Sequence, residues 1–97
     1  MGGTITKGIL ELSKHTGIRT TVIEFAINME MVLSQNDNKG GWDNCKAGYL
    51  WNRLLDEIEE LKMAKVNYGL DRNKFHEVKK ECIDVANFAM MIWDNSI

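Results

Sequence analysis

Four acidic residues form two pairs whose spacing is suited to chemistry: Glu57 with Glu60, and Glu81 with Asp84. Residues three positions apart lie on the same face of a helix, so the members of each pair point in a similar direction. On a helical wheel at about 100° per residue, apolar residues lie within about 60° of Glu57, and Glu60 lies at the edge of their stripe. Those apolar residues are Leu50, Leu54, Leu61 and Ala64.

The second pair is placed in the same way. Phe88, Met91 and Ile92 lie within about 80° of Asp84, and Glu81 lies about 60° from it. Both pairs therefore share sectors with residues of the core type, on two neighbouring helices.

Carboxylates among apolar residues are costly unless a partner compensates their charge. The two apolar stripes offer few basic residues, whereas a divalent cation such as Mg²⁺, with Mn²⁺ as an alternative, prefers carboxylate oxygens. Helical bundles build such sites from inward-facing acids on facing helices. A single Glu-x-x-Glu pattern is usually a solvated helix face, as we expect for Glu59 and Glu77. The pattern alone therefore leaves both a metal site and a salt-bridged structural cluster open.

Helices must position these acids, and the apolar periodicity predicts three strong helices and a weak one. No segment alternates in the way that a half-buried strand does. Thr20 or Thr21 is a candidate cap for the first strong helix, Gly69 a candidate stop for the second and Asn73 a candidate cap for the third. The expected ranges are 5–14 for the weak helix, ending near Gly17, and 21–35, 44–67 and 74–95 for the strong helices.

Length and composition favour one domain over residues 1–97, an all-α helical bundle with a weakly patterned segment at 1–20. The chain of 97 residues contains no proline, which fits long helices. Its longest apolar run, 88–93, is too short to cross a membrane, and no signal peptide is apparent. We therefore expect no membrane partner.

Charge and cysteine content argue against several other classes of protein. A net charge of −2 does not favour binding to a nucleic-acid polymer. Cys45 and Cys82 lack CxxC spacing, which argues against a disulfide framework or zinc site and favours a cytoplasmic location.

The acidic segments resemble a known family. DEIEEL at 56–61 followed by ECID at 81–84 resembles the EExxE and ExxD motifs of the MazG-like all-α nucleoside triphosphate pyrophosphohydrolases. Asp56 replaces the first Glu of that pattern, at a position off the sector of the other acids. NDNKGGW at 36–42 and DVANFAMMI at 84–92 are similar to the flanking segments of short phage and bacterial members. The resemblance spans about residues 25–94.

The resemblance implies a homodimer or homotetramer that binds Mg²⁺ and splits a nucleoside or deoxynucleoside triphosphate into the monophosphate and pyrophosphate. Carried over by position, Glu57, Glu60, Glu81 and Asp84 become the metal ligands. Glu57 or Glu60 also becomes the candidate that assists deprotonation of the attacking water. The implied role is sanitation or adjustment of a nucleotide pool.

Three further residues are candidates for substrate binding. Lys39 in the glycine-containing loop is expected to meet a phosphate, or to be an ordinary exposed lysine. Trp42 either stacks on a base or fixes the loop to the bundle, with the second role slightly favoured. Asn87 shares the sector of the acids and either contacts sugar or base or forms a hydrogen bond in the core.

Two alternatives to the enzyme remain at this stage. The first is a helical protein that binds a nucleotide, to sequester or sense it, without hydrolysis. The second is a structural bundle or subunit adaptor whose acids are salt-bridged. His15 and His76 have no supporting residues in the sequence and are expected at the surface.

Overall fold

The computed structural model describes residues 6–96, and within that range the chain is helical and contains no strand. The predicted all-α class is therefore confirmed. The four α-helices are α1 (Lys7–Thr16), α2 (Thr20–Gln35), α3 (Ala47–Leu70) and α4 (Phe75–Asn95), and the short 3₁₀ turns are η1 (Asp37–Lys39) and η2 (Arg72–Lys74).

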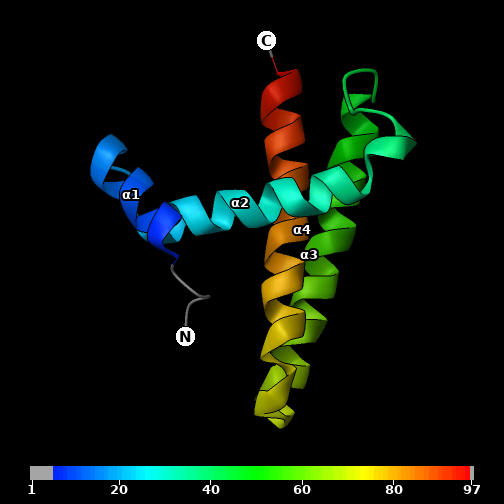
Figure 1. The fold of residues 1–97 in the computed structure, drawn as a ribbon. Coiled ribbons are helices and arrows are strands. Elements are labelled where there is room, and N and C mark those ends of the chain that lie inside the picture. The colour runs from blue at the N-terminus through cyan, green and yellow to red at the C-terminus, as the bar shows by residue number, and fades with distance from the viewer. Residues whose placement is uncertain (1–5, 97) are drawn as a thin grey trace.

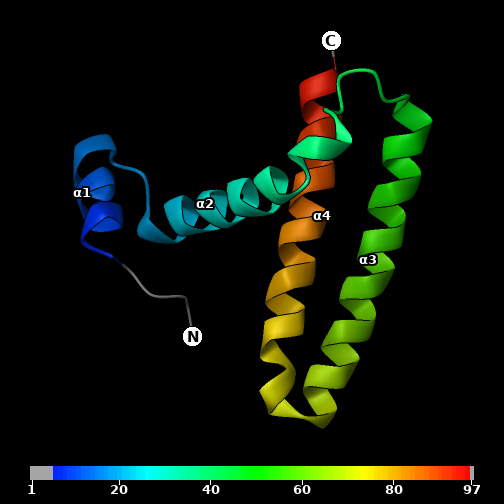
Figure 2. The same ribbon diagram turned by 45° about the vertical axis from the view of Figure 1, so that its right-hand side comes forward.

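The helices form an antiparallel hairpin crossed by a third helix (Figures 1 and 2). Helix α3 lies beside α4 and is joined to it through η2, while α2 crosses and contacts α4. Helix α1 lies at the far end of α2 and, among the described elements, contacts α2 alone. The radius of gyration of 15.2 Å exceeds the roughly 12.5 Å of a compact domain of this length, so the single chain is open.

The weak N-terminal helix has clear boundaries. The Thr6 hydroxyl accepts a hydrogen bond from the Ile9 amide at 3.2 Å, which satisfies a free N–H of the first turn. Gly17 ends the helix with φ of 76°, a left-handed conformation that glycine adopts without strain. The predicted stop is confirmed, and the predicted start at Ile5 lies outside the described residues.

The predicted caps of the strong helices were wrong. The residue before α2 is Arg19, and neither Thr20 nor Thr21 provides a cap. Helix α3 begins at Ala47, about three residues later than expected, and continues through Gly69 to Leu70.

Asn73 does not cap α4, contrary to the prediction. The backbone N–H of Asn73 donates a hydrogen bond to Asp71 Oδ1 at 3.0 Å, and this bond closes the η2 turn between α3 and α4. Local polar residues correctly predicted where the chain turns but not which residue is the cap: Asp71 caps the η2 turn, and no side chain caps α4.

The buried side chains of α3 define a seam against α4. Leu50, Glu57 and Ala64 are buried and lie seven residues apart, the spacing that returns to the same side of a helix after two turns. On α4 the buried residues are Ile83 and Asn87. Thus one acid occupies a core position on α3.

No helix among residues 6–96 has both the length and the apolar character required to span a lipid bilayer.

Candidate metal centre

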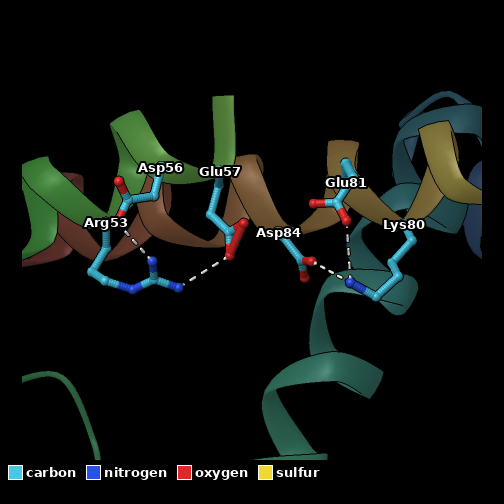
Figure 3. A network of polar contacts seen from close by, with 6 residues as sticks. All are labelled: Arg53, Asp56, Glu57, Lys80, Glu81 and Asp84. Carbon is cyan, nitrogen blue, oxygen red and sulfur yellow. Dashed lines mark hydrogen bonds and ion pairs between the residues drawn. The ribbon is translucent and has the colours of Figure 1, made fainter. Parts of the chain in front are cut away.

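Three carboxylates from the two hairpin helices meet at the seam (Figure 3). Glu57 of α3 and Glu81 and Asp84 of α4 each offer an oxygen, and these oxygens lie within 4.8 Å of one another. Oxygens on opposite sides of one Mg²⁺, at about 2.1 Å from it, lie about 4.2 Å apart, so the observed spacing is close to that of a bound ion. Glu57 is only 6% exposed, because the heptad seam places it between Leu50 and Ala64.

Glu60, the fourth predicted ligand, is not part of this group. It lies one turn along α3 from Glu57 and is exposed. It is still close enough to influence the group, because its carboxylate forms a hydrogen bond with Glu57 that lowers the pKa of Glu60. The structure therefore brings three of the four acids together and places the fourth at their edge.

Arg53 fixes one side of the cluster. Its Nη2 donates to Glu57 Oε1 at 3.2 Å, and its Nη1 donates to Asp56 Oδ2 at 3.1 Å. The guanidinium also lies 5.0 Å from the centre of the Phe88 ring, in cation–π geometry. Arg53 thus holds Glu57 in one orientation.

Lys80 fixes the other side. Its Nζ donates to Asp84 Oδ2 at 3.0 Å and to Glu81 Oε1 at 3.3 Å. The hydrogen bond with Asp84 raises the pKa of Lys80, so its ammonium remains charged.

The expectation that few bases would accompany the acids was therefore wrong. The signal was present in the sequence, because Arg53 precedes Glu57 and Lys80 precedes Asp84 by four residues, the spacing of ion pairs on one helix. Both side chains are long enough to reach a stripe from its flank, which a wheel of Cα positions does not display.

The bases leave part of the cluster uncompensated. Within residues 6–96, the buried side-chain oxygens without a hydrogen-bond partner are Glu57 Oε2, Glu81 Oε2 and Asn87 Oδ1. A buried acceptor without a partner costs free energy, so such atoms are rare unless something binds them. The hydrogen bond with Glu60 is one way to compensate Glu57, whereas a cation held by the three carboxylates would compensate Glu57 Oε2 and Glu81 Oε2 together.

Burial changes the acidity of Glu57. Loss of solvation, followed by the hydrogen bond with Glu60 and the charges of Glu60 and Asp84, raises the pKa of Glu57 to about 7. The nearby Arg53 opposes this shift without cancelling it. In the absence of a cation, Glu57 is therefore protonated in a large fraction of molecules at neutral pH.

Trp42, one of the predicted substrate residues of the loop, lies away from the acids. Trp42 Nε1 donates to Asp94 at 3.0 Å, and the Trp42 carbonyl accepts from Asn95 at 2.9 Å. At 1.5 Å per residue, Asp94 is about 15 Å along α4 from Asp84. These bonds support the role of Trp42 in fixing the loop, while Lys39 is exposed at the end of η1.

Asn87 is 3% exposed and lies one turn from Asp84 on α4. Its Nδ2 donates to the Met29 carbonyl of α2 at 3.3 Å, so it joins the two crossing helices. This is the core hydrogen bond that was one of its two predicted roles; its orphaned Oδ1 leaves the ligand role as a prediction.

An open groove of about 750 Å³ adjoins the acids along the α3–α4 hairpin. Its lining includes Arg53, Glu60, Lys80 and Glu81, so it is bordered by two of the acids and by both bases. His15 and His76 are exposed, as predicted.

Comparison with protein-family models, with curated proteins and with solved structures finds no match for this chain.

Proposed function

We propose that this protein is a Mg²⁺-dependent nucleoside triphosphate pyrophosphohydrolase of the MazG-like type, acting on a nucleoside or deoxynucleoside triphosphate. The observation that carries the proposal is the meeting of Glu57, Glu81 and Asp84 oxygens within 4.8 Å. The orphaned oxygens of Glu57 and Glu81 support a cation there, and the sequence resemblance supplies the reaction.

The reaction requires water to add to the α-phosphorus while the α–β bridging oxygen leaves with pyrophosphate. A bound metal supplies charge neutralisation of the phosphates and a more acidic water. Glu57, Glu81 and Asp84 would hold the ion, with Glu60 joining them by a side-chain movement. Glu57 or Glu60 would assist removal of the proton from the attacking water, as the sequence resemblance implies, and Glu60 lies beside Glu57 at the edge of the three carboxylates.

The proposal includes assembly into a homodimer or homotetramer. An apolar stripe on the side of α3 away from α4 supports it, since isolated exposed apolar residues are ordinary but an aligned row favours a partner. Four members of the row, all within about 80° of one another around the helix, are exposed: Trp51, Leu55, Ile58 and Val66.

The test is incubation of the purified protein with a panel of nucleoside and deoxynucleoside triphosphates and Mg²⁺. We expect equal amounts of monophosphate and pyrophosphate from at least one nucleotide. Glu81→Gln and Asp84→Asn should each lower the rate at least about 100-fold, because each removes a charged metal ligand.

Glu11→Gln is the matched control, because it removes one exposed carboxylate from α1, a helix without contact to the hairpin. It should leave the rate unchanged. Mg²⁺ should also raise the melting temperature of the wild type and not of Asp84→Asn. Folded protein that releases no pyrophosphate from any nucleotide would exclude the enzymatic function; tight nucleotide binding without turnover would establish the sequestering or sensing protein instead.

A further inference from the structure

The two bases at the acidic cluster are held in different ways. The guanidinium of Arg53 is held by three groups, two carboxylates and the Phe88 ring, and the Arg53 side chain is 35% exposed. Lys80 is 68% exposed and is held only at its ammonium, by Glu81 and Asp84 (Figure 3). Of the two bases, Lys80 is therefore the one that can leave without disturbing the packing.

The ammonium of Lys80 contacts two of the three groups that would bind a cation. It lies 3.0 Å from Asp84 Oδ2 and 3.3 Å from Glu81 Oε1. A divalent ion bound by the same carboxylates would repel this positive charge at short range. Occupation by the metal and the observed position of Lys80 therefore exclude each other.

Building on the proposed metal-dependent function, we propose that Lys80 is a displaceable counter-ion of the metal site. Its ammonium neutralises Glu81 and Asp84 when no metal is bound, leaves when the metal binds, and then contacts the phosphates of the nucleotide in the adjoining groove.

The energetics favour this exchange. Exposed ion pairs of lysine contribute little to stability, so displacement of Lys80 is inexpensive compared with the gain from a divalent ion on three carboxylates. Lys80 lines the groove, so its released ammonium remains beside the metal. An ammonium on a flexible stem binds phosphate oxygens as a point charge, without a fixed geometry.

The first measurement is the affinity for Mn²⁺ without nucleotide, by calorimetry or electron paramagnetic resonance. Lys80→Gln should bind Mn²⁺ about threefold to tenfold more tightly than the wild type, because a competing charge is removed. Lys80→Arg, which keeps the charge, should bind close to the wild-type value. Lys79→Gln is the matched control: Lys79 is exposed, lies about 140° from Asp84 around α4, and should not change the affinity.

An affinity of Lys80→Gln equal to or weaker than that of the wild type would overturn the counter-ion role. Melting curves in EDTA check that each variant is folded, and we expect little change because Lys80 is exposed. If neither the wild type nor Lys80→Gln binds Mn²⁺, both this inference and the metal site are wrong.

The second measurement is hydrolysis of the best nucleotide. Lys80→Gln should raise KM about threefold to tenfold with a smaller effect on kcat, and Lys79→Gln should raise neither. An unchanged KM would overturn the phosphate contact. If no variant hydrolyses any nucleotide but Lys80→Gln still tightens Mn²⁺ binding, the proposed function fails while the counter-ion role stands.

Discussion

At the scale of single residues, Glu57 carries the energetic conflict of the candidate site. It occupies a core position of the α3 seam, one of its oxygens has no partner, and its pKa is raised to about 7, mainly by burial. Buried ionisable residues that lower stability and have shifted pKa values are concentrated at functional sites. The burial of Glu57 is therefore an argument for the proposed metal site.

The raised pKa of Glu57 has a consequence for stability without metal. Between about pH 4.5 and 7 the folded protein holds a proton that the unfolded chain has released, so the free energy of unfolding falls as pH rises through this window and stays lower above it. In EDTA, the melting temperature of the wild type should fall from pH 5.5 to 8. In Glu57→Gln the fall in melting temperature should be smaller by roughly 10 °C, which corresponds to a difference in the free energy of unfolding on the order of 2 kcal/mol.

Glu11→Gln serves again as the control and should keep the wild-type slope, because it removes an exposed carboxylate from a different helix. Identical slopes in the wild type and in Glu57→Gln would show that burial does not raise the pKa of Glu57.

At the scale of elements, the α3–α4 hairpin brings the acids together. The two helices are joined by η2, where Asp71 accepts from the Asn73 amide, and the register that this turn sets brings Glu57 opposite Glu81 and Asp84. The length of α3 is part of this arrangement, because the helix continues through Gly69 before the turn begins.

Gly69→Ala tests where α3 ends. Gly69 is helical and an added Cβ would meet nothing within 4 Å, so alanine should stabilise the protein by about 0.5 kcal/mol, or about 2–4 °C in melting temperature. Gly17→Ala is the contrasting variant, because φ of 76° at Gly17 strains any other residue and should lower the melting temperature. A lower melting temperature for Gly69→Ala would indicate that Gly69 ends the helix, as the sequence had predicted.

At the scale of the whole molecule, the chain is open and its core is small. The buried apolar side chains in the described part are Ile9, Ile23, Leu50, Ala64 and Ile83. Helix α2 leaves the hairpin on one side, and large apolar side chains remain exposed on α2, α3 and α4. This exposed apolar surface is an argument for the proposed assembly with further copies of the chain.

The apolar stripe on the outer side of α3 provides the test of assembly. The double variant Leu55→Lys/Ile58→Lys places two charges in the middle of the stripe, and we expect it to lower the molar mass measured by sedimentation to that of the monomer. Leu70→Lys, at the exposed end of α3, should keep the assembly of the wild type. A wild type that sediments as a monomer at all concentrations would contradict the proposed assembly.

The sequence by itself determined the helical class, the approximate helix ranges and the placement of Glu57, Glu81 and Asp84 among apolar residues. These are consequences of periodicity, a local property of the chain that does not depend on how helices meet. For the same reason the sequence analysis counted Glu60 among the metal ligands. A helical wheel of one helix does not distinguish a residue at the edge of the apolar stripe from a residue that faces another helix.

The tertiary structure decided which acids meet and what accompanies them. The register of α3 against α4 brought three carboxylates within 4.8 Å and left Glu60 exposed at their edge. Flexible side chains of sufficient length brought Arg53 and Lys80 to the acids, and the hydrogen bond to Asp94 placed Trp42 near the C-terminal end of α4. The distance between two side chains on different helices depends on how the helices pack and on how far each side chain extends. The pattern of residues along one helix gives no information about either.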